Sequence, residues 1–213
     1  MPKLLCIGDS ITYGAWDTQG GWDSRVRKRI DQECLQSKLK KFYLTYNLGI
    51  SSDTSEQLLQ RFDADVASHM HEEGELMFVF SIGTNDSTRN AKDNKLWVEP
   101  KDFENNVRKL LQKAKRHSDK MLFLGNMPVD ESKTQPYVFD PTITSSNEDI
   151  QAYEKIAMEV CRKENVDCLP VFSQVAAIDY QKLLIFDGLH PNDDGHALLA
   201  DLVWKHIEEK KWL

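Results

Sequence analysis

The chain has 213 residues, a formal net charge of −7 and 40% hydrophobic residues. The length suits one domain that spans residues 1–213, and the hydrophobic content argues against a disordered chain. The acidic charge argues against nucleic acid as a partner, because phosphate binding requires a basic surface.

Short apolar runs that read as strands recur along the chain. They are Lys3–Ile7, Phe42–Leu48, Leu76–Ile82, Met121–Gly125 and Val166–Leu169. Segments with a helical period of apolar residues lie between these runs. The alternation implies right-handed crossovers, so it predicts an α/β protein, a three-layer α/β/α sandwich around a parallel sheet of about five strands.

Signals for helices follow each expected strand. They are Trp22, Val26, Ile30 and Leu35 at helical spacing, a Thr54 cap with Gln57 at the capping-box position, Pro100 at the start of a third helix, an Asn147 cap for a fourth, and a last helix after Gly195. Two long stretches, 86–99 and 127–146, have no regular pattern. Long loops are often functional, so these two could shape a substrate mouth, or they could be surface insertions.

Three polar motifs lie at or directly after the ends of the first three expected strands. They contain Ser10, the pair Asn47 and Gly49, and Asn85. In parallel sheets, ligands bind outside the carboxyl ends of the strands, so we expect these residues to gather at one sheet edge. Each motif alone is also compatible with a helix cap or a turn, and Asp86 beside Asn85 is expected to serve such an Asx turn.

Asp187 and His190 lie three residues apart, just before the last expected helix. Together with Ser10 they supply the serine, histidine and carboxylate of an acyl-transfer nucleophile system. The Ser10 amide at the start of a turn, the Gly49 backbone and the neutral Asn85 amide group are candidate donors to an oxyanion. These residues predict a nucleophile and an oxyanion hole at the same edge.

The other histidines have simpler interpretations. His69 and His71 at the end of a charged helix, and His117 beside two basic residues, are expected to be exposed, whereas His196 and His206 fall inside the last helix. A metal site is not expected, because the third ligand near His69 and His71 is missing.

The four cysteines show neither metal-type spacing nor a disulfide framework, which fits a reducing compartment; they are Cys6, Cys34, Cys161 and Cys168. Cys6 is expected to be a small buried hydrophobe. The chain reaches its first apolar run at once, without the features of a signal peptide, and no apolar run approaches the roughly 20 residues of a membrane span. We therefore expect a cytoplasmic protein without a membrane span.

Four sequence blocks together resemble the SGNH hydrolase superfamily, also called GDSL esterases and lipases. The blocks are Gly8-Asp9-Ser10-Ile11, Gly49 after the second strand, Gly83-Thr84-Asn85-Asp86 and Asp187-Gly188-Leu189-His190. They occur in the family's order and cover the chain nearly from end to end. The resemblance implies a flavodoxin-like fold and the hydrolysis of esters or thioesters without a metal or cofactor.

The same resemblance assigns roles to residues. Ser10 would attack the acyl carbonyl, His190 would take and return the proton, and Asp187 would orient the imidazole. The amides of Ser10 and Gly49 and the side chain of Asn85 would form the oxyanion hole.

The expected function is a serine esterase that acts on small-molecule esters with small or medium acyl groups, including acetylated carbohydrates and lysolipids. An acyltransferase that uses the same acyl-enzyme is the alternative, and a binding module on an enzyme-like scaffold is a third possibility. Trp16, Trp22 and Trp97 fall near the expected mouth, where they could stack on substrate, although Trp22 fits the core better.

Overall fold

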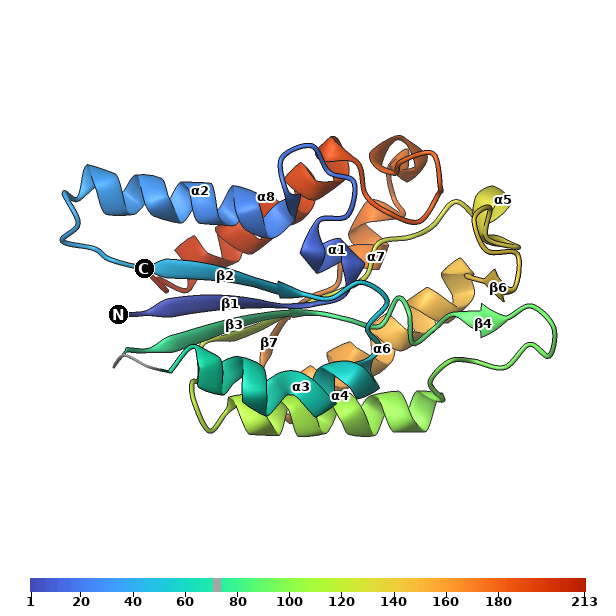
Figure 1. The fold of residues 1–213 in the computed structure, drawn as a ribbon, viewed down its shortest axis with the longest axis horizontal. Helices are drawn as coiled ribbons and strands as arrows, with labels where there is room; N and C mark the ends of the chain where they lie inside the picture. The colour runs from blue at the N-terminus through green and yellow to red at the C-terminus, as the bar shows by residue number, and fades with distance from the viewer. Residues whose placement is uncertain (71–73) are drawn as a thin grey trace.

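The computed structural model describes residues 1–70 and 74–213 as a parallel sheet between two layers of helices (Figure 1). The strands of this sheet are β1 (Lys3–Gly8), β2 (Leu44–Gly49), β3 (Leu76–Ser81), β5 (Met121–Leu124) and β7 (Asp167–Leu169). Their order is β2-β1-β3-β5-β7, and all neighbours are parallel. This confirms the predicted α/β/α sandwich and its flavodoxin-like sheet. The strand order reverses between β1 and β3, which is where open α/β sheets bind ligands.

The helices divide between the two faces of the sheet (Figure 1). One face carries α1 (Ser10–Tyr13), α2 (Gly21–Gln36), α7 (Val171–Val175) and α8 (Asp193–Glu209); the other carries α3 (Ser55–Ser68), α4 (Pro100–Ala114) and α6 (Asn147–Lys163). A 3-10 helix, η1 (Tyr180–Leu183), precedes α8. The short helices α7 and η1 were not expected from the sequence.

Alternate residues of each inner strand enter opposite cores. In β1, Leu5 and Ile7 pack in the core beneath α3 and α4, whereas Leu4 and Cys6 pack in the core beneath α2 and α8. All residues of β1, β3 and β5 are buried. A strand covered on both faces reads as a continuous apolar run, which is why the sequence located these strands well.

Two of the predicted helix starts agree with the structure. Thr54 caps α3 through a capping box with Gln57, and Pro100 is the first residue of α4. Trp22 is fully buried on α2, as expected for a core residue. Leu35 of the same helix was predicted to face inward but is exposed, and Cys34 is buried in its place. Cys34 lies four residues after Ile30, so it stays on the same helix face.

The starts of α6 and α8 differ from the prediction. Ser146, not Asn147, caps α6, because its hydroxyl accepts the Asp149 amide. The last helix begins at Asp193 rather than after Gly195, because Asn192 Oδ1 accepts the amides of residues 194 and 195. Asn and Ser both satisfy amides that a helix start leaves free, and the sequence alone did not choose between neighbouring candidates.

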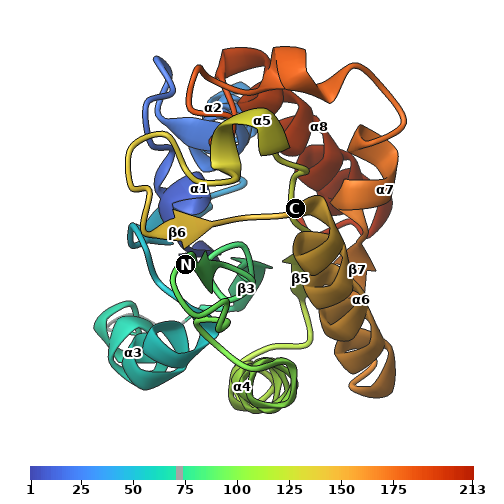
Figure 2. The same cartoon turned by 90° about the vertical axis from the view of Figure 1, so that its right-hand side faces the viewer.

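The two long stretches are more ordered than their sequences suggest. They contain α5 (Glu131–Thr134) and the strands β4 (Arg89–Asn90) and β6 (Ile143–Thr144), which pair antiparallel. Both project from the carboxyl end of the sheet, the end that faces the viewer in Figure 2. The Arg89 guanidinium also binds the Asp149 carboxylate of α6, with two N–O distances of 2.7 Å. The two stretches are therefore paired with each other at the carboxyl end of the sheet, and Arg89 attaches them to α6.

Among the described residues, no helix combines the length and apolar character needed to cross a bilayer.

Candidate active site

Ser10 lies where β1 turns into α1. Asp9 caps this short helix by accepting the Ile11 amide at 2.9 Å, and Ser10 is the first helical residue. Burial raises the pKa of Asp9 to about 6, against the opposing effect of that hydrogen bond. Because Ser10 begins the helix, its amide precedes the intrahelical hydrogen bonds and is available to a ligand.

His190 and Asp187 come from the segment between η1 and α8, and they meet Ser10. The Ser10 hydroxyl lies 2.9 Å from His190 Nε2, and His190 Nδ1 lies 2.6 Å from Asp187 Oδ2. All three residues are buried. The predicted serine, histidine and carboxylate are thus joined in one hydrogen-bonded chain, although Ser10 and His190 are 180 residues apart in sequence.

Asp187 is held as a carboxylate by the groups around it. Its Oδ1 accepts the amides of Leu189 at 2.8 Å and His190 at 3.0 Å. Burial acts to raise its pKa, but the hydrogen bonds from the His190 ring and the two amides outweigh burial and lower the pKa below its ordinary value. An ionised Asp187 fixes His190 with a proton on Nδ1, which leaves Nε2 free to accept one.

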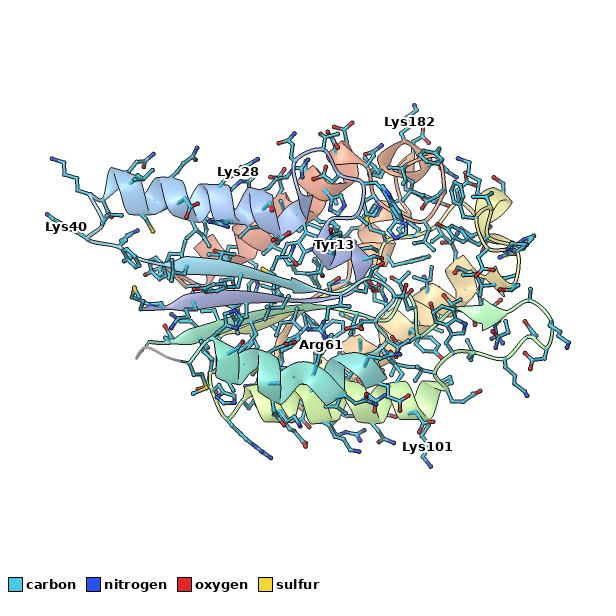
Figure 3. All side chains as sticks on the ribbon, viewed as in Figure 1. Tyr13, Lys28, Lys40, Arg61, Lys101 and Lys182 are labelled. Carbon is cyan, nitrogen blue, oxygen red and sulfur yellow. The ribbon has the colours of Figure 1, made fainter. Side chains whose placement is uncertain are left out.

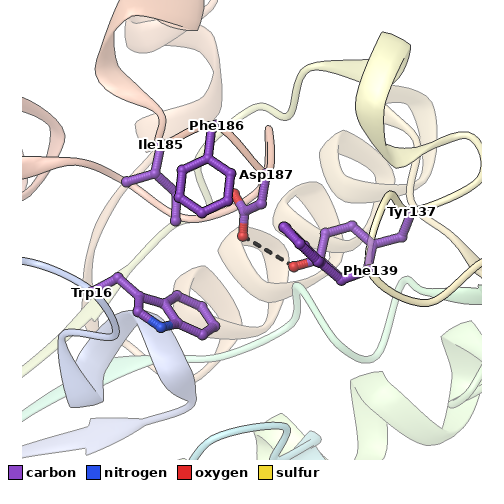
Figure 4. Close-up of a pocket in the computed structure, with 6 residues that line it drawn as sticks. All are labelled: Trp16, Tyr137, Phe139, Ile185, Phe186 and Asp187. Atoms are coloured by element: carbon purple, nitrogen blue, oxygen red, sulfur yellow. Dashed lines mark hydrogen bonds between the residues drawn. The ribbon is translucent and has the colours of Figure 1, made fainter.

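Tyr137 is a member of this cluster that the sequence did not indicate. Its hydroxyl donates to Asp187 Oδ2 at 3.0 Å, the oxygen that also faces His190 (Figure 4). Burial, followed by the charge of Asp187, raises the pKa of Tyr137, so it stays a neutral donor. The only sequence signal was its position within the stretch 127–146, which was interpreted either as part of a substrate mouth or as a surface insertion.

The three candidate oxyanion donors lie at the carboxyl ends of β1, β2 and β3. Gly49 ends β2 beside Gly8, and Asn85 follows β3. The Gly49 amide donates to Asn47 Oδ1 at 2.8 Å, and Asn85 Nδ2 donates to the Asp53 carbonyl at 2.9 Å. A primary amide has two N–H donors, so Asn85 keeps one for a ligand.

The backbone of α1 packs directly on Gly49. A Cβ atom at this position would lie 2.2 Å from the Tyr13 nitrogen and 2.8 Å from the Asp9 carbonyl oxygen. Only glycine allows α1 to rest on β2, and this contact positions the start of α1 where Ser10 lies.

Asp86 has a structural role, although not the predicted Asx turn. Its carboxylate accepts the Ser55 amide at 3.0 Å and the Ser55 hydroxyl, so it binds the N-terminus of α3. Burial raises its pKa to about 7, against the lowering effect of the Ser55 hydrogen bonds.

An aromatic pocket adjoins the serine–histidine–aspartate chain. It has a volume of about 370 Å³. Its lining consists of Trp16, Tyr137, Phe139, Ile185, Phe186 and Asp187 (Figure 4). Trp16 was among the tryptophans expected near the mouth, whereas Trp97 is not one of the pocket's lining residues.

The other histidines among the described residues do not join the cluster. His69 and His117 are half-buried rather than exposed, and His69 packs edge-on against Tyr46. His196 and His206 lie inside α8, as expected, and both are buried. The prediction for His71 lies outside the described residues. Within residues 1–70 and 74–213, no three histidine, cysteine or acidic side chains form a group that could hold a metal ion.

A family model described as the GDSL-like lipase/acylhydrolase family matches residues 6–198. A GDSL esterase/lipase of Arabidopsis thaliana is 23% identical over 218 residues, covering 99% of this chain and 80% of the relative. The Escherichia coli protein named thioesterase 1/protease 1/lysophospholipase L1 is 25% identical over 207 residues, covering 96% and 83%.

Solved structures share the fold at low sequence identity. A lipase/acylhydrolase from Enterococcus faecalis superposes with a TM-score of 0.77 at 20% identity, covering 99% of this chain and 97% of that one. An acetylxylan esterase from Geobacillus stearothermophilus gives a TM-score of 0.70 at 21% identity, covering 96% and 93%. These similarities confirm the fold.

Proposed function

Because the chain belongs to the GDSL-like lipase/acylhydrolase family and is an ester hydrolase, we propose that it cleaves carboxylic esters or thioesters through an acyl-serine intermediate on Ser10. The observation that carries this proposal is the continuous contact from Ser10 Oγ to His190 Nε2 and from His190 Nδ1 to Asp187 Oδ2, at 2.9 and 2.6 Å. A serine hydroxyl is a weak nucleophile until a neighbouring base takes its proton, and this arrangement supplies the base and the group that orients it.

The reaction proceeds in two steps. Ser10 Oγ attacks the carbonyl carbon while its proton moves to His190 Nε2, and the resulting imidazolium is stabilised by the Asp187 carboxylate. His190 then gives the proton to the leaving alcohol or thiol as its bond to carbon breaks. Water repeats the sequence on the acyl-serine: His190 accepts a proton from the water, and Ser10 leaves with it.

The negative oxygen of each tetrahedral intermediate needs donors that are in place before the reaction. We assign this role to the Ser10 amide, the second N–H of Asn85 and the Gly49 amide. The Gly49 amide donates to Asn47 Oδ1, so an oxyanion would replace the Asn47 side chain as its acceptor. Asn85 Nδ2 is held by the Asp53 carbonyl through one N–H, so its second N–H is the donor assigned to the oxyanion.

The expected substrates are esters of small or medium acyl groups. An acetylxylan esterase and a protein named thioesterase and lysophospholipase are among the similar proteins, which favours acetylated carbohydrates or lysolipids as natural substrates. The net charge of −7 and the Asp187 carboxylate in the pocket disfavour anionic esters.

The test compares p-nitrophenyl acetate hydrolysis by the wild-type protein, Ser10→Ala and His190→Ala. We expect each substitution to lower kcat on the order of 10³-fold or more. Wild-type activity should also fall in acid, because only neutral imidazole accepts a proton. Full activity in His190→Ala would rule out the base role, and equal rates for wild type and Ser10→Ala would rule out the acyl-serine.

A further inference from the structure

The aromatic pocket is built from three segments that are distant in sequence. Trp16 comes from the turn after α1, Tyr137 and Phe139 from the stretch before β6, and Ile185, Phe186 and Asp187 from the segment before α8 (Figure 4). Phe139 packs edge-on against both neighbours, with ring centroids 5.9 Å from Tyr137 and 5.7 Å from Phe186. Among the described residues that line the pocket, Asp187 is the one that carries a charge, and its oxygens are already hydrogen-bonded.

Several of these aromatic rings are exposed and do not pack in the protein core. Phe186, Trp16 and Phe139 are 74%, 66% and 63% exposed. Exposed aromatic side chains grouped around a hollow are typical of binding sites rather than of packing.

Trp16 is placed at the pocket by an unusual backbone conformation. Its φ angle is 61°, in the left-handed region that bulky residues rarely adopt. The neighbouring Asp17 is fixed by the Arg25 guanidinium at 3.0 Å and by the Gly21 amide. As a result, the Trp16 ring meets the His190 ring edge-on at a centroid distance of 4.6 Å.

This position defines which part of an ester enters the pocket. On the proposed function, His190 Nε2 must deliver its proton to the oxygen of the leaving alcohol, so the alcohol departs on the His190 side of Ser10. The carbonyl oxygen points instead to the donors near Gly49 and Asn85. Trp16 lines the pocket and contacts the His190 ring, and Asp187 also lines the pocket. The pocket therefore lies on the leaving-group side of Ser10.

We propose that this pocket binds the alcohol part of the substrate, and that this alcohol is uncharged and ring-shaped, with an apolar face that packs on Phe186, Phe139 and Trp16. An aryl alcohol and a pyranose both have this chemistry, because each presents a flat face of C–H or ring carbon to an aromatic side chain. The proposal rests on the proposed acyl-serine mechanism and adds the identity of the leaving group to it.

The test compares Phe186→Ala with wild type on acetates that differ only in the alcohol: phenyl acetate, a methyl pyranoside monoacetate and ethyl acetate. The ratio of variant to wild-type kcat/KM is taken for each ester, so that the intrinsic reactivity of the leaving group cancels. Phe42→Ala is the matched control, because Phe42 is an exposed phenylalanine outside the pocket.

We expect Phe186→Ala to lower kcat/KM about 3- to 10-fold for a ring-bearing ester and to leave ethyl acetate nearly unchanged. The ester with the larger loss, phenyl acetate or the methyl pyranoside monoacetate, identifies the bound alcohol as an aryl alcohol or as a sugar. The deacylation rate constant should be the same in Phe186→Ala and wild type, because the alcohol has already left when the acetyl-enzyme is hydrolysed. For Phe42→Ala, the ratio of variant to wild-type kcat/KM should be one for every ester.

Two outcomes would overturn the proposal. An equal loss on all three acetates would mean that the ring of the alcohol is not bound by Phe186. A changed preference between phenyl acetate and phenyl hexanoate, with no dependence on the alcohol, would assign the pocket to the acyl chain. Failure of the mechanism itself is distinguishable, because no acetyl-enzyme would then form in the wild-type protein.

Discussion

At the scale of single residues, the Asp187 carboxylate is the point where the candidate site is most tightly connected. It accepts hydrogen bonds from the His190 ring, from two backbone amides and from the Tyr137 hydroxyl. The sequence predicted Asp187 and His190 because their spacing within one short turn is itself a pattern. It did not predict Tyr137, because a tyrosine 50 residues away in a stretch without periodicity carries no signal of that contact.

We predict that Tyr137→Phe lowers kcat by about 10-fold, because the Tyr137 hydroxyl holds Asp187 Oδ2 in the position from which it orients the His190 ring. The variant keeps the aromatic ring that lines the pocket, so the substitution removes only the hydroxyl donor. Steady-state kinetics with p-nitrophenyl acetate measure kcat and KM for both proteins. An unchanged kcat in folded Tyr137→Phe would show that this hydroxyl does not position Asp187.

At the scale of elements, α3 holds the strand ends that carry the site. Arg61 of α3 lies between this helix and the sheet (Figure 3), and it donates to the carbonyls of Gly8 at 3.0 Å and Leu48 at 2.9 Å. The same guanidinium binds the Asp53 carboxylate at 2.7 Å, and the Asp53 carbonyl holds Asn85. One helix thus fixes the ends of β1 and β2 and the candidate oxyanion donor after β3.

The carboxyl group of Asp86 at the N-terminus of α3 gives a pH-dependent stability. Its folded pKa of about 7 lies above the ordinary value of 3.8. The folded state therefore keeps a proton that the unfolded state loses, so stability from this group is complete below about pH 4 and is lost as the pH rises to about 7. The substitution Asp86→Asn replaces the carboxyl group with an amide that does not titrate in this range.

We predict that urea unfolding at a series of pH values from about 4 to 8 will show this loss in wild type and a weaker loss in Asp86→Asn. The difference between the two unfolding free energies should change by up to about 1.4 kcal/mol per pH unit and become constant above about pH 7. Two profiles that stay parallel across this range would mean that Asp86 is ionised in the folded protein.

At the scale of the whole molecule, the parts predicted well from sequence are those fixed by burial. Strands such as β1 and β3 are apolar apart from Lys3 and Ser81 at their ends, because both faces are covered. Their parallel direction follows from the alternation of strands with helices. The pairing of β4 with β6 and the aromatic pocket were not predictable in this way. They depend on contacts between loops that are distant in sequence, and no local pattern specifies those contacts.

A mutation in the core should lower the stability of the protein without lowering the activity of the folded molecules. Phe78 of β3 is fully buried and stacks on Phe80, with ring centroids 5.8 Å apart. We predict that Phe78→Ala reduces the free energy of unfolding by about 3–5 kcal/mol, because a large cavity replaces the ring. Activity per folded molecule should be retained, as chemical denaturation and active-site titration can establish. A loss of kcat in fully folded protein would show that the core also controls the geometry of the site.

The most direct test of the central claim is to detect the acyl-enzyme. Wild-type protein is mixed with p-nitrophenyl acetate, quenched in acid within the first turnover, digested and analysed by mass spectrometry. We predict one acetyl group on the peptide that contains Ser10, and none in Ser10→Ala. Hydrolysis by the wild-type protein with no acetylated Ser10 at any quench time, together with undiminished hydrolysis by Ser10→Ala, would contradict the account.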